Sequence, residues 1–288
     1  MIISELKVYP DEVQALKGKK RKGVLMKNFK KVLALVLALV MVLSFAACGG
    51  GDDKAGGDAV VYKVGTEPTF PPFDTTDDAG NIVGFDMDLI AAIGEDQGFE
   101  VTFENLQFDS LIPALQAGNI DIIAAGMNCE DAERREQVDF STPYYESGLV
   151  VAVAADNETI TGVDSLTPDM KVAAQIGTTG ADAVTELAAE GKIKEAVILN
   201  GLDTAMLQLI NGDVQAVIND LPVTKAYIEK QPDAIKIVGD VMNAEAYAIA
   251  VQKGNTELLE KINTGMANIQ ASGKFDEIYN AWFGEAEA

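Results

Sequence analysis

The 288-residue chain contains no histidine, the side chain that most often moves protons in catalysis at neutral pH. Without histidine there is no Ser-His-Asp triad, and no cluster of residues has the spacing of a zinc site. The G-x-S-x-G elbow of α/β-hydrolases is absent as well. These absences exclude several classes of enzyme, although a carboxylate could still act as a general acid or base.

Cysteine and long apolar runs are also scarce. Only Cys48 and Cys129 occur, too few for the disulfide framework of a small secreted domain. We expect Cys129 to be a partly buried structural residue. The apolar run at residues 32–45 is shorter than the about 20 residues that a membrane-spanning helix needs.

Basic residues are few outside the N-terminal region. The chain has 22 Lys and Arg against 45 Asp and Glu. Nine of the basic and three of the acidic residues lie in residues 1–47, so residues 48–288 hold 13 against 42, a net charge of −29. Nucleic acids and anionic lipids bind positively charged patches, so this composition argues against both as partners.

The N-terminal region has the features of an export signal. Three lysines in residues 26–31 precede the apolar run, and SFAAC follows it. SFAAC resembles a bacterial lipobox with Cys48 as the lipidated residue, although Phe45 stands where leucine is usual. The alternative is ordinary secretion with a free Cys48 thiol. The expected segments are an upstream extension from a misassigned start codon (1–25), a lipoprotein signal peptide (26–47) and a flexible Gly/Asp-rich tether (48–59).

From residue 60 onward, short apolar segments alternate with amphipathic ones, which is the pattern of an α/β protein. The expected strands are 60–66, 99–104, 120–126, 171–177, 196–200 and 214–220. The expected helices are 84–98, 110–118, 181–191, 203–213, 256–272 and 275–283.

The two halves of this region repeat one architecture. LQAGNIDIIAAG (115–126) aligns without a gap with LINGDVQAVIND (209–220). Two βαβαβ units suggest two lobes, each a mainly parallel sheet flanked by helices. The extended segments 147–157 and 245–254 would cross between the lobes as a two-strand hinge. The expected division is residues 60–150 and 247–288 for lobe 1 and residues 151–246 for lobe 2.

The repeat also predicts a binding site, because ligands of open α/β sheets bind outside the carboxyl ends of the strands. It places Ala125 and Gly126 of one lobe and Asp220 of the other at equivalent strand ends. Gly126 would let the backbone approach a ligand, and Arg134 or Arg135 could hold a carboxylate with a guanidinium fork. Asp220 would suit an ammonium group, so the pattern favours a zwitterion. The alternative is that both arginines cover a solvated helix face.

Other loops at strand ends supply further candidates. The loop after the first strand carries Glu67 and Phe70, unless it is only a proline-stiffened turn whose aromatic rings enter the core. Phe108 follows the second strand and offers another aromatic wall. The Thr178 and Thr179 hydroxyls, with free amides at a helix start, would complete an anion site. No P-loop lysine follows them.

An acidic segment, DTTDDAGN (74–81), does not fit an EF-hand calcium loop. That loop needs glycine at its sixth position and glutamate at its twelfth, where this chain has Ala79 and Phe85. A polar hairpin turn is the better interpretation.

Several segments together resemble a known family. They are VGTEPTFPPFD, IVGFDMDLIAAI, FDSLIPALQAGNIDII, QVDFSTPYYESG, AAQIGTTGADAV, VQAVINDLP and FDEIYNAWFG. In this order, over residues 60–284, they resemble the bacterial extracellular solute-binding proteins of family 3, the polar amino-acid receptors of ABC importers. The resemblance implies a two-lobed periplasmic-binding-protein-like fold that closes around one amino acid, with no cofactor.

The resemblance also implies partners and location. An exported monomer would be anchored by lipid on the outer face of the cytoplasmic membrane, or be periplasmic in a host with an outer membrane. It would deliver its amino acid to an ABC permease and the ATPase of that permease. Two alternatives remain: an enzyme like cyclohexadienyl dehydratase on the same fold, and a ligand-sensing receptor domain.

By the family pattern, Arg134 holds the α-carboxylate and Asp220 the α-ammonium, helped by amides near Asn128 and Thr179. The residues implied to shape the side-chain pocket are Glu67, Phe70, Phe108, Asn128 and Gln175. The family has its arginine seven residues after the glycine, whereas Arg134 stands eight after Gly126, so Arg135 remains the alternative.

The sequence does not decide which side chain the bound amino acid has. Glu67 favours a cationic side chain such as that of arginine or lysine. Asn128 and Gln175 carry uncharged amides and fit glutamine as well.

Overall fold

The structure is a computed structural model that describes residues 60–284. The expected upstream extension (1–25), signal peptide (26–47) and tether (48–59), together with the lipidation site Cys48, lie outside the described residues. Within residues 60–284, no helix combines the length and the apolar character that a membrane crossing requires.

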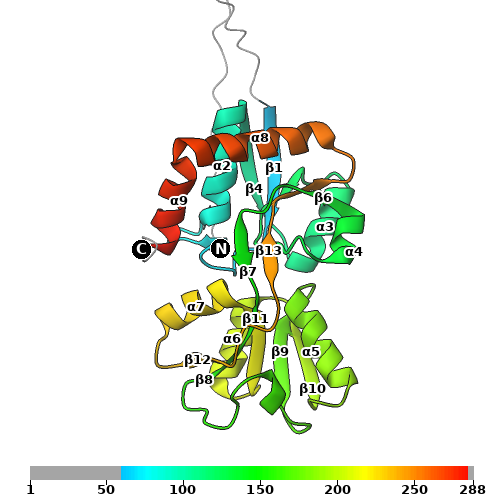
Figure 1. The fold of residues 1–288 in the computed structure, drawn as a ribbon, viewed down its shortest axis with the longest axis vertical. Coiled ribbons are helices and arrows are strands. Elements are labelled where there is room, and N and C mark those ends of the chain that lie inside the picture. Colours follow the sequence, from blue (N-terminus) through cyan, green and yellow to red (C-terminus); the bar gives the residue numbers. More distant parts are fainter. Residues whose placement is uncertain (1–59, 285–288) are drawn as a thin grey trace, which may run out of the picture. The chain divides into compact units, whose positions relative to one another are not determined.

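The described residues form two lobes, each built on a five-stranded sheet with helices packed against it (Figure 1). In spatial order, the strands of the first lobe are β4 (Phe99–Asn105), β1 (Val60–Thr66), β5 (Ile122–Ile123), β14 (Ala250–Gln252) and β6 (Val138–Phe140). Only β14 runs against the others of this sheet. The helices of this lobe are α2 (Phe85–Gln97), α3 (Phe108–Gln116), α4 (Ala132–Gln137), α8 (Thr256–Ser272) and α9 (Lys274–Phe283).

The second lobe repeats this plan. In spatial order, its strands are β10 (Glu195–Leu199), β9 (Lys171–Gln175), β11 (Ala216–Asp220), β8 (Leu149–Ala154) and β12 (Ile235–Val238). Only β8 runs against the others of this sheet. The helical segments are η1 (Val163–Ser165), α5 (Thr179–Ala189), α6 (Leu202–Asn211) and α7 (Leu221–Lys230). The expected α/β class with two mainly parallel sheets is confirmed.

A pair of short antiparallel strands, β7 (Tyr145–Ser147) and β13 (Glu245–Tyr247), lies between the lobes (Figure 1). β7 continues through Gly148 into β8 of the second lobe, and β13 leads back to β14 of the first lobe. The chain therefore crosses twice, which confirms the expected two-strand hinge. The crossing points lie next to the expected lobe boundaries after residues 150 and 246.

The sequence repeat corresponds to a repeated strand register. In the first lobe, Ile122 lies opposite Val64 in a parallel pair of strands. In the second lobe, Ala216 lies opposite Val172 in the same arrangement. Ile122 and Ala216 are the residues that the ungapped alignment matches, so the carboxyl ends of β5 and β11 are equivalent.

Two local predictions can also be compared with the structure. Phe85, Leu89 and Ile93 on one face of α2 are all fully buried, as their spacing predicts. The acidic segment forms the expected hairpin between β2 (Thr75–Thr76) and β3 (Ile82–Val83). Its turn is closed by the Asp77 carboxylate, which accepts the backbone N–H of Ala79 at 2.9 Å.

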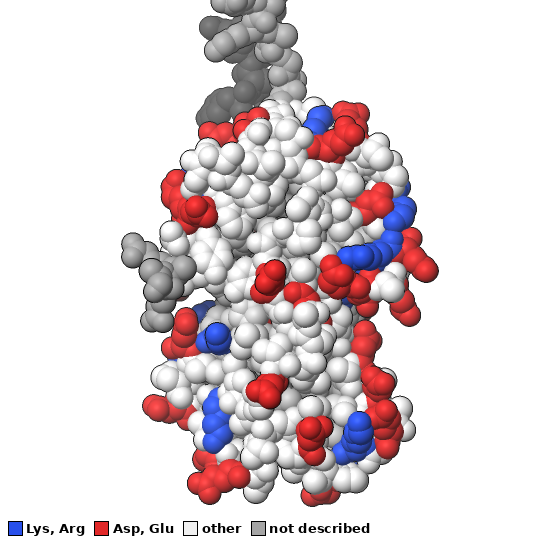
Figure 2. All heavy atoms as spheres, in the orientation of Figure 1, with Lys and Arg blue, Asp and Glu red and all other residues white. Residues whose placement is uncertain are grey.

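Acidic side chains are spread over both lobes on the face shown in Figure 2, and basic side chains are fewer there. This distribution follows from the acidic composition of the chain. Long-range attraction of anions to this face would therefore be weak, and a bound anionic group needs a buried local cation.

Candidate functional site

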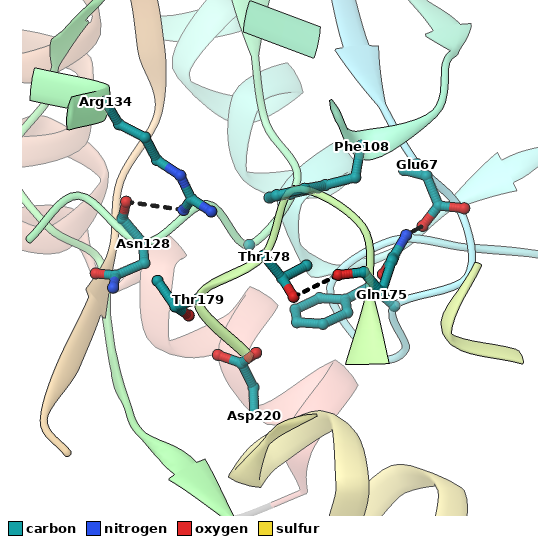
Figure 3. Close-up of a pocket in the computed structure, with 10 residues that line it drawn as sticks. Glu67, Phe108, Asn128, Arg134, Gln175, Thr178, Thr179 and Asp220 are labelled. Atoms are coloured by element: carbon teal, nitrogen blue, oxygen red, sulfur yellow. Dashed lines mark hydrogen bonds between the residues drawn. The ribbon is translucent and has the colours of Figure 1, made fainter. Parts of the chain in front are cut away.

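One pocket lies where the strand ends of the two lobes face each other (Figure 3). Its lining consists of Glu67, Phe70, Phe108, Gly126, Asn128, Arg134, Gln175, Thr178, Thr179 and Asp220. Every one of these is a residue that the sequence predicts for the site. Residues from both lobes contribute because the carboxyl ends of their central strands point towards the hinge.

Ala125 is the predicted residue that the pocket lining does not include. Its side chain is 1% exposed and belongs to the buried cluster of Leu111, Leu115 and Met127 beside α3. Successive side chains point to opposite faces of the sheet, and Ala125 falls on the face that α3 covers. Its contribution is to the core of the first lobe.

Gly126 supports the site through its conformation. Its φ is +54°, and a Cβ atom there would come within 2.7 Å of the Phe70 ring. A larger residue would therefore push the Phe70 ring out of place. The Gly126 N–H itself cannot bind a ligand, because it donates to the buried Asp86 carboxylate at 2.7 Å. The Tyr144 hydroxyl donates to the same oxygen at 2.8 Å, which fixes the turn.

Arg134 reaches the pocket from α4. The Asp131 carboxylate caps this helix by accepting the Arg134 backbone N–H at 2.8 Å. The guanidinium donates to the Asn128 carbonyl at 3.2 Å and to the Gly177 carbonyl at 2.9 Å, and it lies 5.4 Å from the centre of the Phe108 ring. Burial lowers its pKa, although an arginine remains charged at neutral pH. Its unused N–H groups can hold a carboxylate.

Arg135 is directed elsewhere. Its Nε donates to the Cys129 carbonyl, and its Nη2 pairs with the exposed Glu130 carboxylate at 2.8 Å. Of the two candidate arginines, the structure thus places Arg134 in the pocket and Arg135 on the surface. Cys129 itself is 2% exposed.

The start of α5 forms the anion-binding side of the second lobe. Thr178 caps the helix: its hydroxyl accepts the Ala181 N–H at 3.1 Å and donates to the Gln175 carbonyl at 2.7 Å. The Thr178 hydroxyl proton is therefore engaged, so that Thr178 faces a ligand mainly with its backbone. Thr179, the first residue of α5, also lines the pocket, and the N-terminus of a helix is a favourable place for a carboxylate.

Asp220, at the end of β11, is 6% exposed. Its Oδ1 accepts the Tyr247 hydroxyl at 2.5 Å and the Ser147 hydroxyl at 3.4 Å. Burial first, and the neighbouring Glu245 carboxylate second, raise its pKa to about 8. These three partners all come from the hinge, and sequence reasoning missed them. The one hint in the sequence was that residues 245–247 (EAY) begin an extended segment expected to cross between the lobes.

The opposite end of the pocket holds Glu67 and Gln175. The Glu67 carboxylate accepts the Gln175 amide at 3.0 Å and the Thr69 hydroxyl at 2.7 Å. Burial raises the Glu67 pKa, and the nearby Asp203 raises it further, whereas both hydrogen bonds lower it. A cationic or hydrogen-bond-donating group placed here would favour the charged carboxylate.

The lobes touch directly across the pocket. The contacts are Arg134 to the Gly177 carbonyl, Gln175 to Glu67, and the Tyr227 hydroxyl to the Thr69 carbonyl at 3.1 Å. The cavity offers only about 10 Å³ to the centre of a water-sized sphere, which is room for about one water molecule. This is a closed arrangement, and an amino acid enters only if the lobes part.

Within residues 60–284, no group of three or more Cys, Asp or Glu side chains is arranged to hold a metal ion. The chemistry of the pocket rests on one buried guanidinium, two buried carboxylates, amides, hydroxyls and two aromatic rings. Such a set recognises a small molecule that carries both charges.

Comparisons with known proteins extend these findings. The model of the family "Bacterial extracellular solute-binding proteins, family 3" matches residues 62–285. The probable histidine-binding protein of Neisseria gonorrhoeae is 33% identical over 264 residues, which is 89% of this chain and 96% of that protein.

Solved structures are similar as well. An ancestral arginine-binding protein bound to arginine is 42% identical with a TM-score of 0.74, and its glutamine-bound form is 43% identical with a TM-score of 0.72. Both cover 78% of this chain and 98% of their own. An ancestral amino-acid-binding protein, described as a precursor of cyclohexadienyl dehydratase, is 34% identical with a TM-score of 0.71 and covers 77% of this chain and 95% of its own.

Proposed function

Because the chain belongs to the bacterial extracellular solute-binding proteins of family 3, we propose that it captures a polar L-amino acid and delivers it to an ABC-type importer. One observation carries the proposal. A buried guanidinium from the first lobe, Arg134, and a buried carboxylate from the second, Asp220, line the same pocket. A zwitterion satisfies both charges at once, which few other metabolites can do.

Each part of the amino acid has a matching group. The α-carboxylate accepts from Arg134, with Thr179 and the amides of its helix on the other side. The α-ammonium donates to Asp220. The side chain then extends between the aromatic walls towards Glu67 and Gln175, because these residues lie at the remaining end of the lining.

The charges of the pocket indicate which side chains fit. Once the zwitterion has engaged Arg134 and Asp220, Glu67 is the remaining ionisable group of the lining. A cationic side chain, as in arginine or lysine, would neutralise it, and a glutamine amide would donate to it. The bound ligands named for similar proteins, arginine and glutamine, support the same two classes. An acidic side chain would meet repulsion at Glu67.

Binding would be coupled to movement of the lobes about the hinge. In solution the ligand would enter an open form, and its contacts with both lobes would favour the closed form that the permease recognises. Lipid at Cys48 and a tether over residues 48–59 would keep the monomer at the outer face of the membrane. These parts of the proposal rest on the N-terminal sequence.

A thermal-shift screen of residues 49–288 against the twenty amino acids tests the function. The protein would first be unfolded and refolded to remove any bound ligand. A ligand at a hundred times its Kd stabilises by about 2.7 kcal/mol, so we expect arginine, lysine or glutamine to raise the Tm by about 5 °C or more. Failure of all twenty amino acids would refute the proposed function. Appearance of a product from prephenate or arogenate would instead favour the dehydratase alternative, for which Glu67 is the candidate acid.

The contact between Tyr227 and Thr69 provides a test of closure outside the pocket. A neutral hydrogen bond contributes about 0.5–1.5 kcal/mol, so Tyr227→Phe should weaken binding about two- to tenfold. We expect faster ligand dissociation in stopped-flow measurements and an unchanged preference between arginine and glutamine. The control is Tyr62→Phe, because Tyr62 stands on β1 of the first lobe and, among the described residues, its hydroxyl makes no hydrogen bond to the second lobe. A changed preference would contradict a role confined to closure.

A further inference from the structure

The hinge contributes a second buried carboxylate to the region of Asp220. Glu245, the first residue of β13, is 3% exposed. Its Oε1 accepts the Asn243 side-chain amide at 3.1 Å, but its buried Oε2 has no hydrogen-bond partner in the described part of the chain. Burying a carboxylate oxygen without a partner is unfavourable. A purely structural role does not account for glutamate at this position.

The strand geometry directs Glu245 towards Asp220. Glu245 and Tyr247 lie on one face of β13 because alternate side chains share a face. The Tyr247 hydroxyl donates to Asp220 Oδ1 at 2.5 Å. Ser147, which lies opposite Glu245 across the hinge, donates to the same oxygen at 3.4 Å. Glu245 is close enough for its charge to raise the pKa of Asp220.

The charges around this pair are unbalanced. The positive charge of Arg134 on α4 faces both carboxylates. It also faces two further carboxylates, Asp131 before α4 and Asp182 on α5, which reduce the attraction it can offer to Asp220 and Glu245. Tyr247 stays neutral, since burial raises its pKa well above the ordinary value. When a ligand carboxylate occupies Arg134, the two hinge-side carboxylates need another positive charge. An ammonium group supplies one.

We propose that Asp220, with the buried Glu245 side chain beside it, holds a proton before a ligand binds, and that binding of an ammonium group at Asp220 releases this proton to the buffer. Arg134 lowers the pKa of Asp220 by less than burial and Glu245 raise it, so Asp220 needs a second cation before it is charged, and an ammonium is such a cation. Glu245 is thus a positioning residue that acts through Asp220 and sets the pH dependence of affinity. The inference rests on the proposed function, because it places the ammonium of an amino acid at Asp220.

The direction of the pH dependence follows from the charges. Burial and Glu245 raise the pKa of Asp220 to about 8, so below this pH binding must remove a proton. Affinity should therefore fall by up to about tenfold for each pH unit below 8. Arginine and glutamine keep the same charge over this range, so the change belongs to the protein.

Titration calorimetry of residues 49–288 tests the inference. The probes are L-arginine and L-glutamine, each titrated at pH values of about 6, 7 and 8 in phosphate and in imidazole, which both buffer over this range. Each released proton is taken up by the buffer, and the two buffers differ in ionisation enthalpy. The difference between the binding heats measured in the two buffers therefore gives the number of protons released. We expect close to one proton at pH about 6 and about half a proton at pH about 8, where half of the Asp220 carboxyl groups are already charged.

Glu245→Gln tests whether Glu245 helps to keep the proton on Asp220. Because burial remains as the larger cause of the raised pKa, this variant should release less proton than the wild type without losing the release altogether, and its affinity below pH 8 should rise. The control is Glu146→Gln: Glu146 lies on the neighbouring hinge strand opposite Ala246 and is exposed, so its substitution should change neither quantity. If Glu245 only supported the fold, its substitution would lower affinity equally at every pH.

The possible results distinguish a failure of the proton-release inference from a failure of the proposed amino-acid binding. Binding of a probe by the wild type without proton release overturns the inference and leaves the proposed function standing; this result does not depend on any variant folding. Proton release that persists undiminished in Glu245→Gln also overturns it. Failure of every amino acid to bind refutes the proposed function and with it the inference.

Discussion

Arg134→Ala should lose amino-acid binding by about a hundredfold or more, whereas Arg135→Ala should bind within a few fold of the wild type. Removing one partner of a buried charge pair costs about 3 kcal/mol, and Arg134 is 8% exposed beneath the Phe108 ring. Arg135 forms an exposed ion pair with Glu130, and such pairs contribute about 0–1 kcal/mol. Calorimetry with arginine and glutamine measures both variants.

The two substitutions are matched controls for each other, because they remove the same charge from adjacent positions of one helix. Arg134→Lys adds a third comparison, since it keeps the charge but loses the planar fork. We expect an intermediate loss of affinity. Melting curves without ligand show whether each variant is folded. Normal binding by Arg134→Ala, together with loss in Arg135→Ala, would reverse the assignment.

The choice between these arginines illustrates what the sequence could not decide. Successive residues of a helix point about 100° apart, so a shift by one residue moves the guanidinium from the pocket to the surface. The chain has one residue more than the family spacing between Gly126 and the arginine. In the structure, α4 begins immediately after its capping residue Asp131, and this start determines that Arg134 faces inward.

The repeat within the sequence was the most informative feature of the chain. It matched residues that occupy the same register in the two sheets, so it predicted which strand ends face each other. Strand ends are local features that apolar runs and following glycines mark. This explains why Gly126 and Asp220 could be identified from the residues alone, whereas Gln175 was implied only by the family resemblance.

The hinge partners of Asp220 could not be found in this way. Tyr247 is 27 residues away in sequence and Ser147 is 73 residues away. Both lie in extended segments whose apolar character predicts strands and carries no sign of a binding role. Helix α7 was also missed, although Asp220 followed by Pro222 is a helix-start signal that could have revealed it. Its Tyr227 then reaches back to the first lobe.

Asp220→Asn should abolish binding as strongly as Arg134→Ala, by about a hundredfold or more, yet it should make the ligand-free protein more stable. Asparagine has nearly the same shape and can still accept the Tyr247 hydroxyl, but it cannot neutralise an ammonium group. The stability change has the opposite sign because the native carboxylate is buried beside Glu245. Its pKa is raised from 3.8 to about 8 in the folded protein.

The pH dependence follows from this shift. Between pH about 4 and 8 the unfolded chain releases a proton that the folded protein retains, so the stability of the ligand-free wild type falls as the pH rises. Asparagine does not titrate and removes this fall. Urea unfolding at pH about 7 should therefore give a higher midpoint for Asp220→Asn than for the wild type, and the two should converge near pH 4.

Asp213→Asn is the matched control, because Asp213 is an exposed carboxylate of the same lobe. It should leave binding and the pH dependence of stability unchanged. If Asp220→Asn is instead less stable than the wild type at neutral pH, the buried carboxylate contributes to folding and our account of its charge is wrong. If it is more stable and does not bind, Asp220 lowers the stability of the unliganded fold so that an ammonium group can be bound strongly.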